Sequence, residues 1–204
     1  KNEYNKDIAE KRITNFFANA AYMIKKKPVD NLIIGLIGDL IGGYIHPELE
    51  QTNSMSPMRG ISFVKNLIIS GLKYLHDQLP ELEKITIIGI CGNHSRTTKK
   101  MQFSNGFEMN HEYFMYKDIE RTLTLMGLTK FNFIIPESEF AYIDVYGKKV
   151  LFAHGHQFRT AGGIGGIYPS MMRWYAKMNQ TIKIDKAFLG HYHQMVYTKE
   201  VCVN

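Results

Sequence analysis

Helical and strand patterns alternate in the first part of the chain. Apolar residues at 5–27 recur with the spacing of one helical face, and Pro28 ends that segment. A continuous apolar run at 31–38 is typical of a strand that is covered on both faces. The same two patterns return as an amphipathic helix at 61–79 and a second covered strand at 84–90. This alternation predicts an α/β domain.

The second half of the chain is richer in short strands. A third helix is predicted at 109–127, with Gly127 as its C-terminal cap. Short strands follow in close succession, and the segment YGKK between two of them is typical of a hairpin turn. A glycine-rich loop at 162–166 leads into a fourth helix, after which a strand, a loop and another strand are expected. Helices first and strands later predict two packed sheets with helices outside them. The strand-rich segments lie at 130–136, 139–147, 148–155 and 186–204.

Composition and charge restrict the class of protein only broadly. The chain has 204 residues, of which 45% are hydrophobic and 22% are charged, and it fits a single domain over 1–204. Its formal net charge of +6 is compatible with an anionic partner. The two cysteines form no disulfide framework and no CxxC pair, so we expect a reducing, cytoplasmic location. We find neither a signal-peptide pattern nor an apolar run as long as a membrane span, and we expect no membrane partner.

Aspartate, asparagine and histidine residues, all able to bind a metal ion, follow four of the predicted strands. Each group lies beside a glycine, which allows a sharp turn and the close approach of a ligand. Ligand sites gather at the carboxyl ends of strands in such folds, so we expect the groups to meet. Their oxygen and nitrogen donors suit manganese, iron, zinc and similar divalent ions. The residues are Asp39, Asn93, His94, His154, His191 and His193. By contrast, His46, His76 and His111 are interpreted as ordinary core or surface histidines.

The order of four short motifs makes this pattern specific. GDLIG at 38–42, GNH at 92–94, HGH at 154–156 and GHYH at 190–193 lie on successive strand ends. In this order they resemble the motifs of the calcineurin-like metallophosphoesterases. The resemblance implies an α/β fold with four layers, an α/β/β/α sandwich of two mixed sheets. It also implies a centre of two divalent metal ions, for which we expect manganese, with iron, zinc or magnesium as alternatives.

The resemblance implies a role for each residue of this centre. Asp39 would bridge the two ions, and His193 would bind one of them. His94 is not a ligand in this pattern and would protonate the leaving oxygen or stabilise the phosphoryl group. Paired cations suit this chemistry because they neutralise an anionic phosphoester and lower the pKa of a bridging water. The implied ligands of the other ion are Asn93, His154 and His191.

The chain also departs from the family pattern. The family's first motif, D-x-H, is absent and is expected just before Lys1, and the chain stops soon after GHYH, where the family usually continues with more strand. We therefore expect the chain to be trimmed at both ends. Ser95 stands where the family usually has an acidic residue after GNH, so that either its hydroxyl orients His94 weakly or another acid takes over this role. The segments NEYNKDIAEKR, GNHSRTTKK and GGIGGIYP look more like a phage-associated branch that is related to DNA-repair exonucleases.

Basic residues near the motifs are candidates for substrate binding. Arg96, Lys99 and Lys100 either hold the flanking phosphates of a polynucleotide or belong to a solvated loop. Arg159 suits a bidentate contact with a phosphate. His156 either reaches the substrate or supports its own loop.

The glycine-rich segment GGIGG has two interpretations. Its glycines, with Gly163 and Gly165 among them, either offer backbone N–H groups to a phosphate or form a lid or a packing turn. It is not a Walker A loop, because no GK[ST] follows.

The sequence therefore predicts a hydrolase, a divalent-metal-dependent phosphoesterase that acts on a phosphate-containing substrate. The phosphodiester bonds of DNA are the first candidate. A phosphomonoesterase acting on a protein, a nucleotide or a small molecule would use the same metal centre, so this alternative stays open. A third alternative is a non-catalytic binding module that keeps the fold. The oligomeric state is not predicted.

Overall fold

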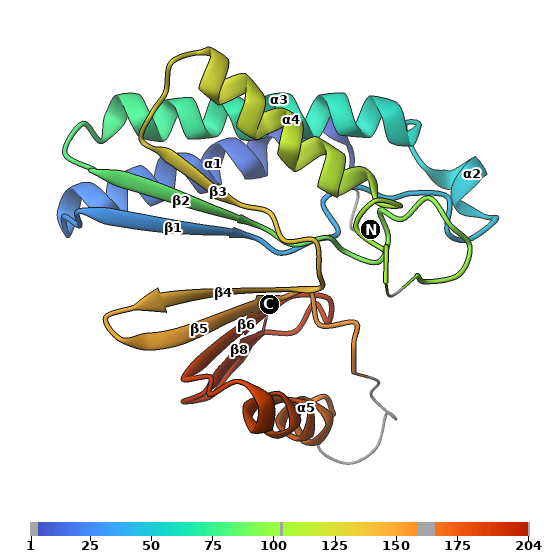
Figure 1. Ribbon diagram of the computed structural model, residues 1–204. Helices are drawn as coiled ribbons and strands as arrows, with labels where there is room; N and C mark the ends of the chain where they lie inside the picture. Colours follow the sequence, from blue (N-terminus) through green and yellow to red (C-terminus); the bar gives the residue numbers. More distant parts are fainter. Residues whose placement is uncertain (1–3, 103, 159–165, 204) are drawn as a thin grey trace.

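Four layers of secondary structure make up the part of the chain that the computed structural model describes, residues 4–102, 104–158 and 166–203. Helices cover the outer face of one sheet, a second sheet packs below the first, and a further helix covers its outer face (Figure 1). The predicted α/β/β/α sandwich is confirmed. The helices are α1 (Lys6–Lys26), α2 (Leu49–Thr52), α3 (Pro57–Gln78), α4 (His111–Leu125) and α5 (Tyr168–Thr181).

The first sheet has the order β1-β2-β3, and its described pairs are all parallel. The second sheet has the order β4-β5-β6-β8-β7 and is mixed, because β4 and β7 run antiparallel to their neighbours. The strands of the first sheet are β1 (Asn31–Leu36), β2 (Lys84–Gly89) and β3 (Phe131–Ile134). Those of the second are β4 (Phe140–Val145), β5 (Lys148–Ala153), β6 (Lys186–Leu189), β7 (Val196–Tyr197) and β8 (Val201–Val203).

Helix α3 shows how local sequence sets an element. Ser56 caps it by accepting a hydrogen bond from the Arg59 N–H, and Pro57 fits the first turn, where a missing N–H costs nothing. The helix thus starts at Pro57, earlier than the predicted 61. Its buried face includes Ile68 and Leu72 and packs against the first sheet.

The predicted hairpin turn joins β4 to β5. Tyr146 and Gly147 have φ angles of 51° and 75°, the paired positive values of a two-residue turn that matches strand twist. A separate apolar cluster, with Phe152 and Ile88 among its members, lies between the two sheets. No helix among the described residues is long and apolar enough to cross a membrane.

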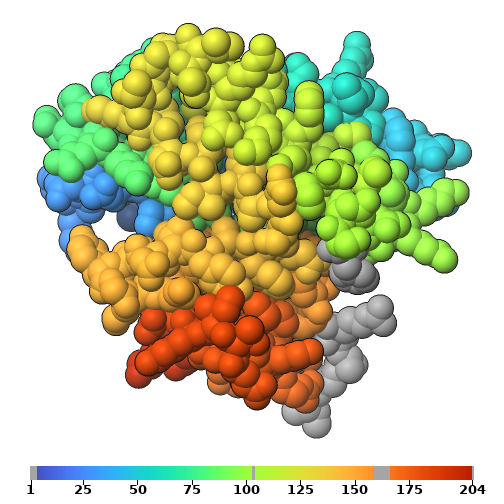
Figure 2. Space-filling model, viewed as in Figure 1, coloured from blue at the N-terminus to red at the C-terminus, as the bar shows by residue number. Residues whose placement is uncertain are grey.

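The prediction that the strand at 31–38 is covered on both faces is wrong. In the structure β1 lies at the end of its sheet, and Ile33 is 38% exposed. Its inner face borders a hollow of about 490 Å³ between the sheets, lined also by Val150 and Phe152. Figure 2 shows this side of the molecule open between the blue segments and the gold β4–β5 region. The cover of a strand depends on what lies across from it, which the local pattern does not contain.

Candidate metal centre

Three polar side chains from different strand ends meet beside the junction of the two sheets. Asp39 follows β1, Asn93 follows β2 and His154 follows β5. The Nε2 atom of His154 lies 3.0 Å from Asp39 Oδ2 and 3.1 Å from Asn93 Oδ1. His191, which follows β6, completes a group with Asp39 and His154 whose possible ligand atoms all lie within 4.8 Å of one another.

The hydrogen bond on the far side of the His154 ring fixes which nitrogen carries the proton. His154 Nδ1 lies 2.6 Å from the carbonyl oxygen of Ile37, which can only accept, so Nδ1 donates. In the neutral ring Nε2 then presents a lone pair, and it faces the oxygens of Asp39 and Asn93. Three acceptors meet at one point, an arrangement that requires a proton or a cation between them.

Strained backbone accompanies these side chains. Of the four described non-glycine residues with positive φ, three belong to the predicted centre: Asp39 at 57°, His191 at 75° and His193 at 51°. Such conformations are costly and collect at functional sites. Gly38 also has a positive φ, and a Cβ there would overlap the backbone of Gly92, so both glycines are needed for the close approach of the two loops.

The chemistry of His191 suits a metal ligand. The Nδ1 atom of His191 is buried and has no hydrogen-bond partner within the described structure. Buried polar atoms are normally paired, and those that are not deserve an explanation such as an ion. Together with the acceptors around His154 Nε2, the residues of this group fit a divalent cation that takes nitrogen and oxygen ligands.

The charges of the group are coupled. Burial alone would raise the pKa of Asp39, but the hydrogen bond and charge of His154 outweigh it and lower the pKa to about 2. Burial disfavours the charged form of His154, yet its hydrogen bond to Asp39 raises the pKa of the ring. Burial and the charge of His154 lower the pKa of His191 to about 4. Asp39 is thus ionised and His191 neutral near pH 7, as metal ligands must be.

The other predicted site residues, His193 and His94, lie at different places relative to this group. His193 is exposed and lines the same hollow of about 590 Å³ as Asp39 and His191, but it does not belong to the close group. The backbone N–H of His94 donates to Asp39 Oδ1 over 2.9 Å. The ring of His94 has its centroid 6.4 Å from that of His46, which is exposed, as a surface histidine would be.

Arg96 braces its own loop. Its guanidinium donates to the carbonyl oxygens of Asn93 at 2.6 Å, Thr98 at 3.0 Å and Lys99 at 3.2 Å. These bonds give Arg96 a structural role beside its predicted phosphate contact. Ser95 is fully buried and donates to Asn110 Oδ1, so its hydroxyl supports the loop instead of the His94 ring.

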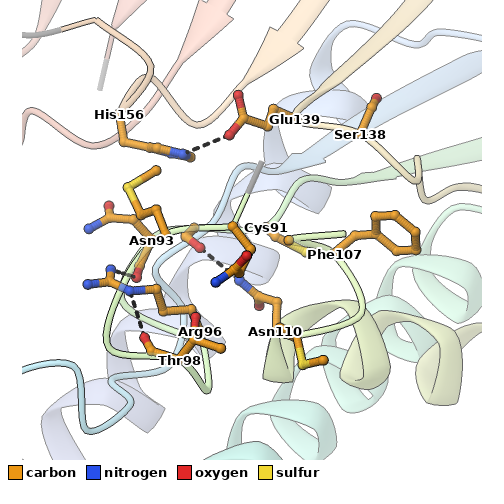
Figure 3. Close-up of a pocket in the computed structure, with 14 residues that line it drawn as sticks. Cys91, Asn93, Arg96, Thr98, Phe107, Asn110, Ser138, Glu139 and His156 are labelled. Carbon is orange, nitrogen blue, oxygen red and sulfur yellow. Dashed lines mark hydrogen bonds and ion pairs between the residues drawn. The ribbon is translucent and has the colours of Figure 1, made fainter. Parts of the chain in front are cut away.

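His156 lies on the wall of a second, smaller pocket beside Asn93. Figure 3 shows His156 directed toward Glu139, across the pocket from Asn93 and Arg96. Its Nε2 lies 3.3 Å from Glu139 Oε1, and its Nδ1 is buried without a partner in the described structure. Arg159, Gly163 and Gly165 lie outside the described residues.

Two acidic residues at the site escaped the sequence analysis. Glu139 directly precedes β4 and offered no motif. Glu112 is the second residue of α4, in the first turn, where an acidic residue is ordinary because it suits the helix dipole. Only the fold shows that Glu112 reaches the loops of the metal centre.

Comparisons with known proteins add little. Neither a protein-family model nor a curated protein matches this sequence. Among solved structures, the chain is similar to one described as a novel archaeal phosphodiesterase, with 13% identity over 92% of this chain and 72% of that chain. The TM-score is 0.37, which is too low to establish a shared fold or activity. We therefore base the function on the side chains of this chain.

Proposed function

We propose that this chain is a divalent-metal-dependent phosphoesterase. The observation that carries the proposal is the meeting of Asp39 Oδ2, Asn93 Oδ1 and His154 Nε2, with the His154 tautomer fixed by Ile37. A proton alone could bridge two of these acceptors, but His191 belongs to the same group and its Nδ1 is buried without a partner in the described structure, which favours a cation.

The donor set defines what the residues would hold. Asp39, Asn93, His154 and His191 would bind one ion, and Asp39 would share its carboxylate with a second ion bound by His193. Bound divalent ions supply charge neutralisation for an anionic ester and a water of lowered pKa. Without thiolate ligands the set suits manganese, with iron, zinc and magnesium as alternatives. The neutral amide of Asn93 leaves the loaded site positive toward a phosphate.

His94 is the proposed proton donor to the leaving oxygen. Burial lowers the pKa of this ring, the charge of Asp39 raises it, and the neighbouring His46 lowers it again. An anionic ester close to the ring would raise its pKa, because an opposite charge favours the protonated form. Proton donation by a positioned side chain typically accelerates such reactions by about 10²–10⁴-fold.

We propose the phosphodiester bonds of DNA as the substrate. The net charge of +6 supports an anionic substrate, and Lys99 and Lys100 are exposed in the loop that follows Asn93 and His94. Arg96 supports this less than its charge suggests, because backbone carbonyls occupy its guanidinium.

The test compares three substrates with manganese and with a chelator. We expect hydrolysis of bis-p-nitrophenyl phosphate and of a single-stranded DNA oligonucleotide with Mn²⁺, lost when EDTA is added. We also expect DNA binding to weaken steeply with salt, since phosphate contacts release counterions. Cleavage of p-nitrophenyl phosphate alone would replace the diesterase with a phosphomonoesterase. Binding of Mn²⁺ without hydrolysis of any substrate would indicate a non-catalytic module.

A further inference from the structure

Glu112 is a buried carboxyl group without a cationic partner among the described residues, and burial raises its pKa while the backbone N–H groups of Gly92 and Leu40 lower it. It lies in the first turn of α4 with 0% of its surface exposed. None of the ion pairs between described residues includes it. Charged groups are almost never fully buried unless something compensates them, so its partners matter.

The partners of Glu112 are backbone N–H groups of two loops. Oε1 accepts from Leu40 at 2.5 Å and from Ile41 at 3.3 Å, and Oε2 accepts from Gly92 at 2.7 Å. Leu40 directly follows Asp39, and Gly92 directly precedes Asn93. One side chain thus joins the loop of the carboxylate ligand to the loop of the amide ligand, across more than 70 residues of sequence in the first case.

The two loops lie in close contact at Gly92. A Cβ on Gly92 would overlap both the backbone and the carboxylate of Asp39. Asn110 fixes the other side of Gly92 by donating from Nδ2 to its carbonyl oxygen at 2.9 Å. Asn110 also caps α4 by accepting from the Glu112 N–H at 2.9 Å. The helix start, Glu112 and the Gly92 loop therefore form one hydrogen-bonded unit.

We propose that Glu112 is a positioning residue of the metal centre, which holds the Asp39 loop and the Asn93 loop at the separation that cation binding needs. This inference rests on the proposed metal-dependent function. Groups that orient metal ligands from outside the coordination shell typically contribute about 10–100-fold to metal affinity or activity. A carboxylate suits the role because its two oxygens accept from both loops at once.

The test replaces Glu112 with glutamine, Glu112→Gln, and measures Mn²⁺ binding by calorimetry. Glutamine keeps the size of the side chain, but its amide group has only one acceptor oxygen and turns N–H donors toward one of the loops. We expect Mn²⁺ affinity to fall about 10–100-fold while far-UV circular dichroism is unchanged. The matched control is Glu120→Gln on the same helix, whose carboxylate pairs with Lys117 at the surface.

Each outcome bears on a different claim. Equal Mn²⁺ affinity in Glu112→Gln and wild type would overturn the role of Glu112 and leave the proposed function standing. Wild-type protein that binds Mn²⁺ but cleaves no phosphoester would overturn the proposed function alone. Wild-type protein that binds no Mn²⁺ would overturn both.

A measurement on the wild type keeps the inference testable if the variant does not fold. In amide hydrogen exchange, we expect the N–H groups of Leu40, Ile41 and Gly92 to exchange slowly and to slow further when Mn²⁺ is added. The exposed residues Lys99 and Lys100 serve as the internal reference. Exchange of the three amides at the rate of this reference would overturn the positioning role of Glu112.

Discussion

The two sheets contribute unlike halves to the candidate centre. The oxygen-donor half, Asp39 and Asn93, follows the first sheet and is held by hydrogen bonds to its own loops, with Glu112 between them. The imidazole half consists of His154, His191 and His193, after the second sheet. There, His154 is tied to Ile37, whereas His191 keeps a buried nitrogen without a described partner.

The two halves therefore differ in what holds them in place before a cation binds. Hydrogen bonds within the protein already form the oxygen-donor half, so it provides a preorganised charge. The imidazole half retains hydrogen-bonding capacity that nothing in the described structure uses, and a cation would satisfy it. Changes in the first half should therefore remove function outright. Changes in the imidazole half should alter the pH dependence of stability and the affinity for the metal ion.

The largest effect is expected from Asp39→Asn. The carboxylate, with its pKa near 2, is charged at every ordinary pH, and the substitution removes that charge from beside His154. We expect Mn²⁺-dependent cleavage of bis-p-nitrophenyl phosphate to fall roughly 10⁴-fold, the equivalent of several kcal/mol of lost electrostatic stabilisation. The control is Asp144→Asn, because Asp144 is exposed on β4. Activity within tenfold of wild type would show that Asp39 does not hold the ions.

The second-largest effect is expected from His94→Ala, which separates metal binding from proton donation. In His94→Ala the backbone N–H that bonds Asp39 remains, and only the imidazole is lost. We therefore expect Mn²⁺ affinity to stay within about threefold of wild type while turnover falls about 10³-fold, in the range of a lost general acid.

The control for that variant is His76→Ala on α3, whose ring contacts Asp77 on the surface. A parallel loss of metal binding in His94→Ala would mean that the ring itself belongs to the ligand set. The oxygen-donor half would then contain an imidazole ligand, His94, as well.

Local sequence was sufficient to predict which polar residues follow the strands and lie near one another; their role as metal ligands stays a prediction. Asp39, Asn93, His154 and His191 follow apolar strands, and the end of such a strand is visible in a single short segment. Parallel pairing of β1 with β2 and of β5 with β6 then brings the donors to matching edges. The hairpin at Tyr146 was predictable for the same reason, since turn chemistry is local.

Contacts between distant segments could not be predicted in this way. Glu112 has the sequence context of an ordinary first-turn acid, and its bonds to Leu40 and Ile41 depend on how α4 packs over the first sheet. The exposure of Ile33 depends likewise on the space between the sheets. Arg96 looked free in sequence because nothing local shows that its loop folds back onto the guanidinium.

The smallest effect is expected in the pH dependence of stability, which tests the pKa of His191 in the imidazole half. In the folded chain the pKa of His191 is lowered from 6.5 to about 4, first by burial and then by the charge of His154. Between these pH values the unfolded chain binds a proton at this site and the folded chain does not. The free energy of unfolding must therefore fall as pH falls through this window.

Glutamine has no such proton, so His191→Gln should lose this part of the pH dependence. We expect a change of about 1 kcal/mol, because the ring is only partly buried and solvent screens its charge. Urea unfolding in EDTA, at pH values from 6.5 down to 4, measures it without bound metal. His193→Gln is the control, since that ring is exposed on the same loop. Parallel curves of unfolding free energy against pH for His191→Gln and wild type would mean that folding does not disfavour the charged ring. The imidazole half would then not differ from the oxygen-donor half in the way described above.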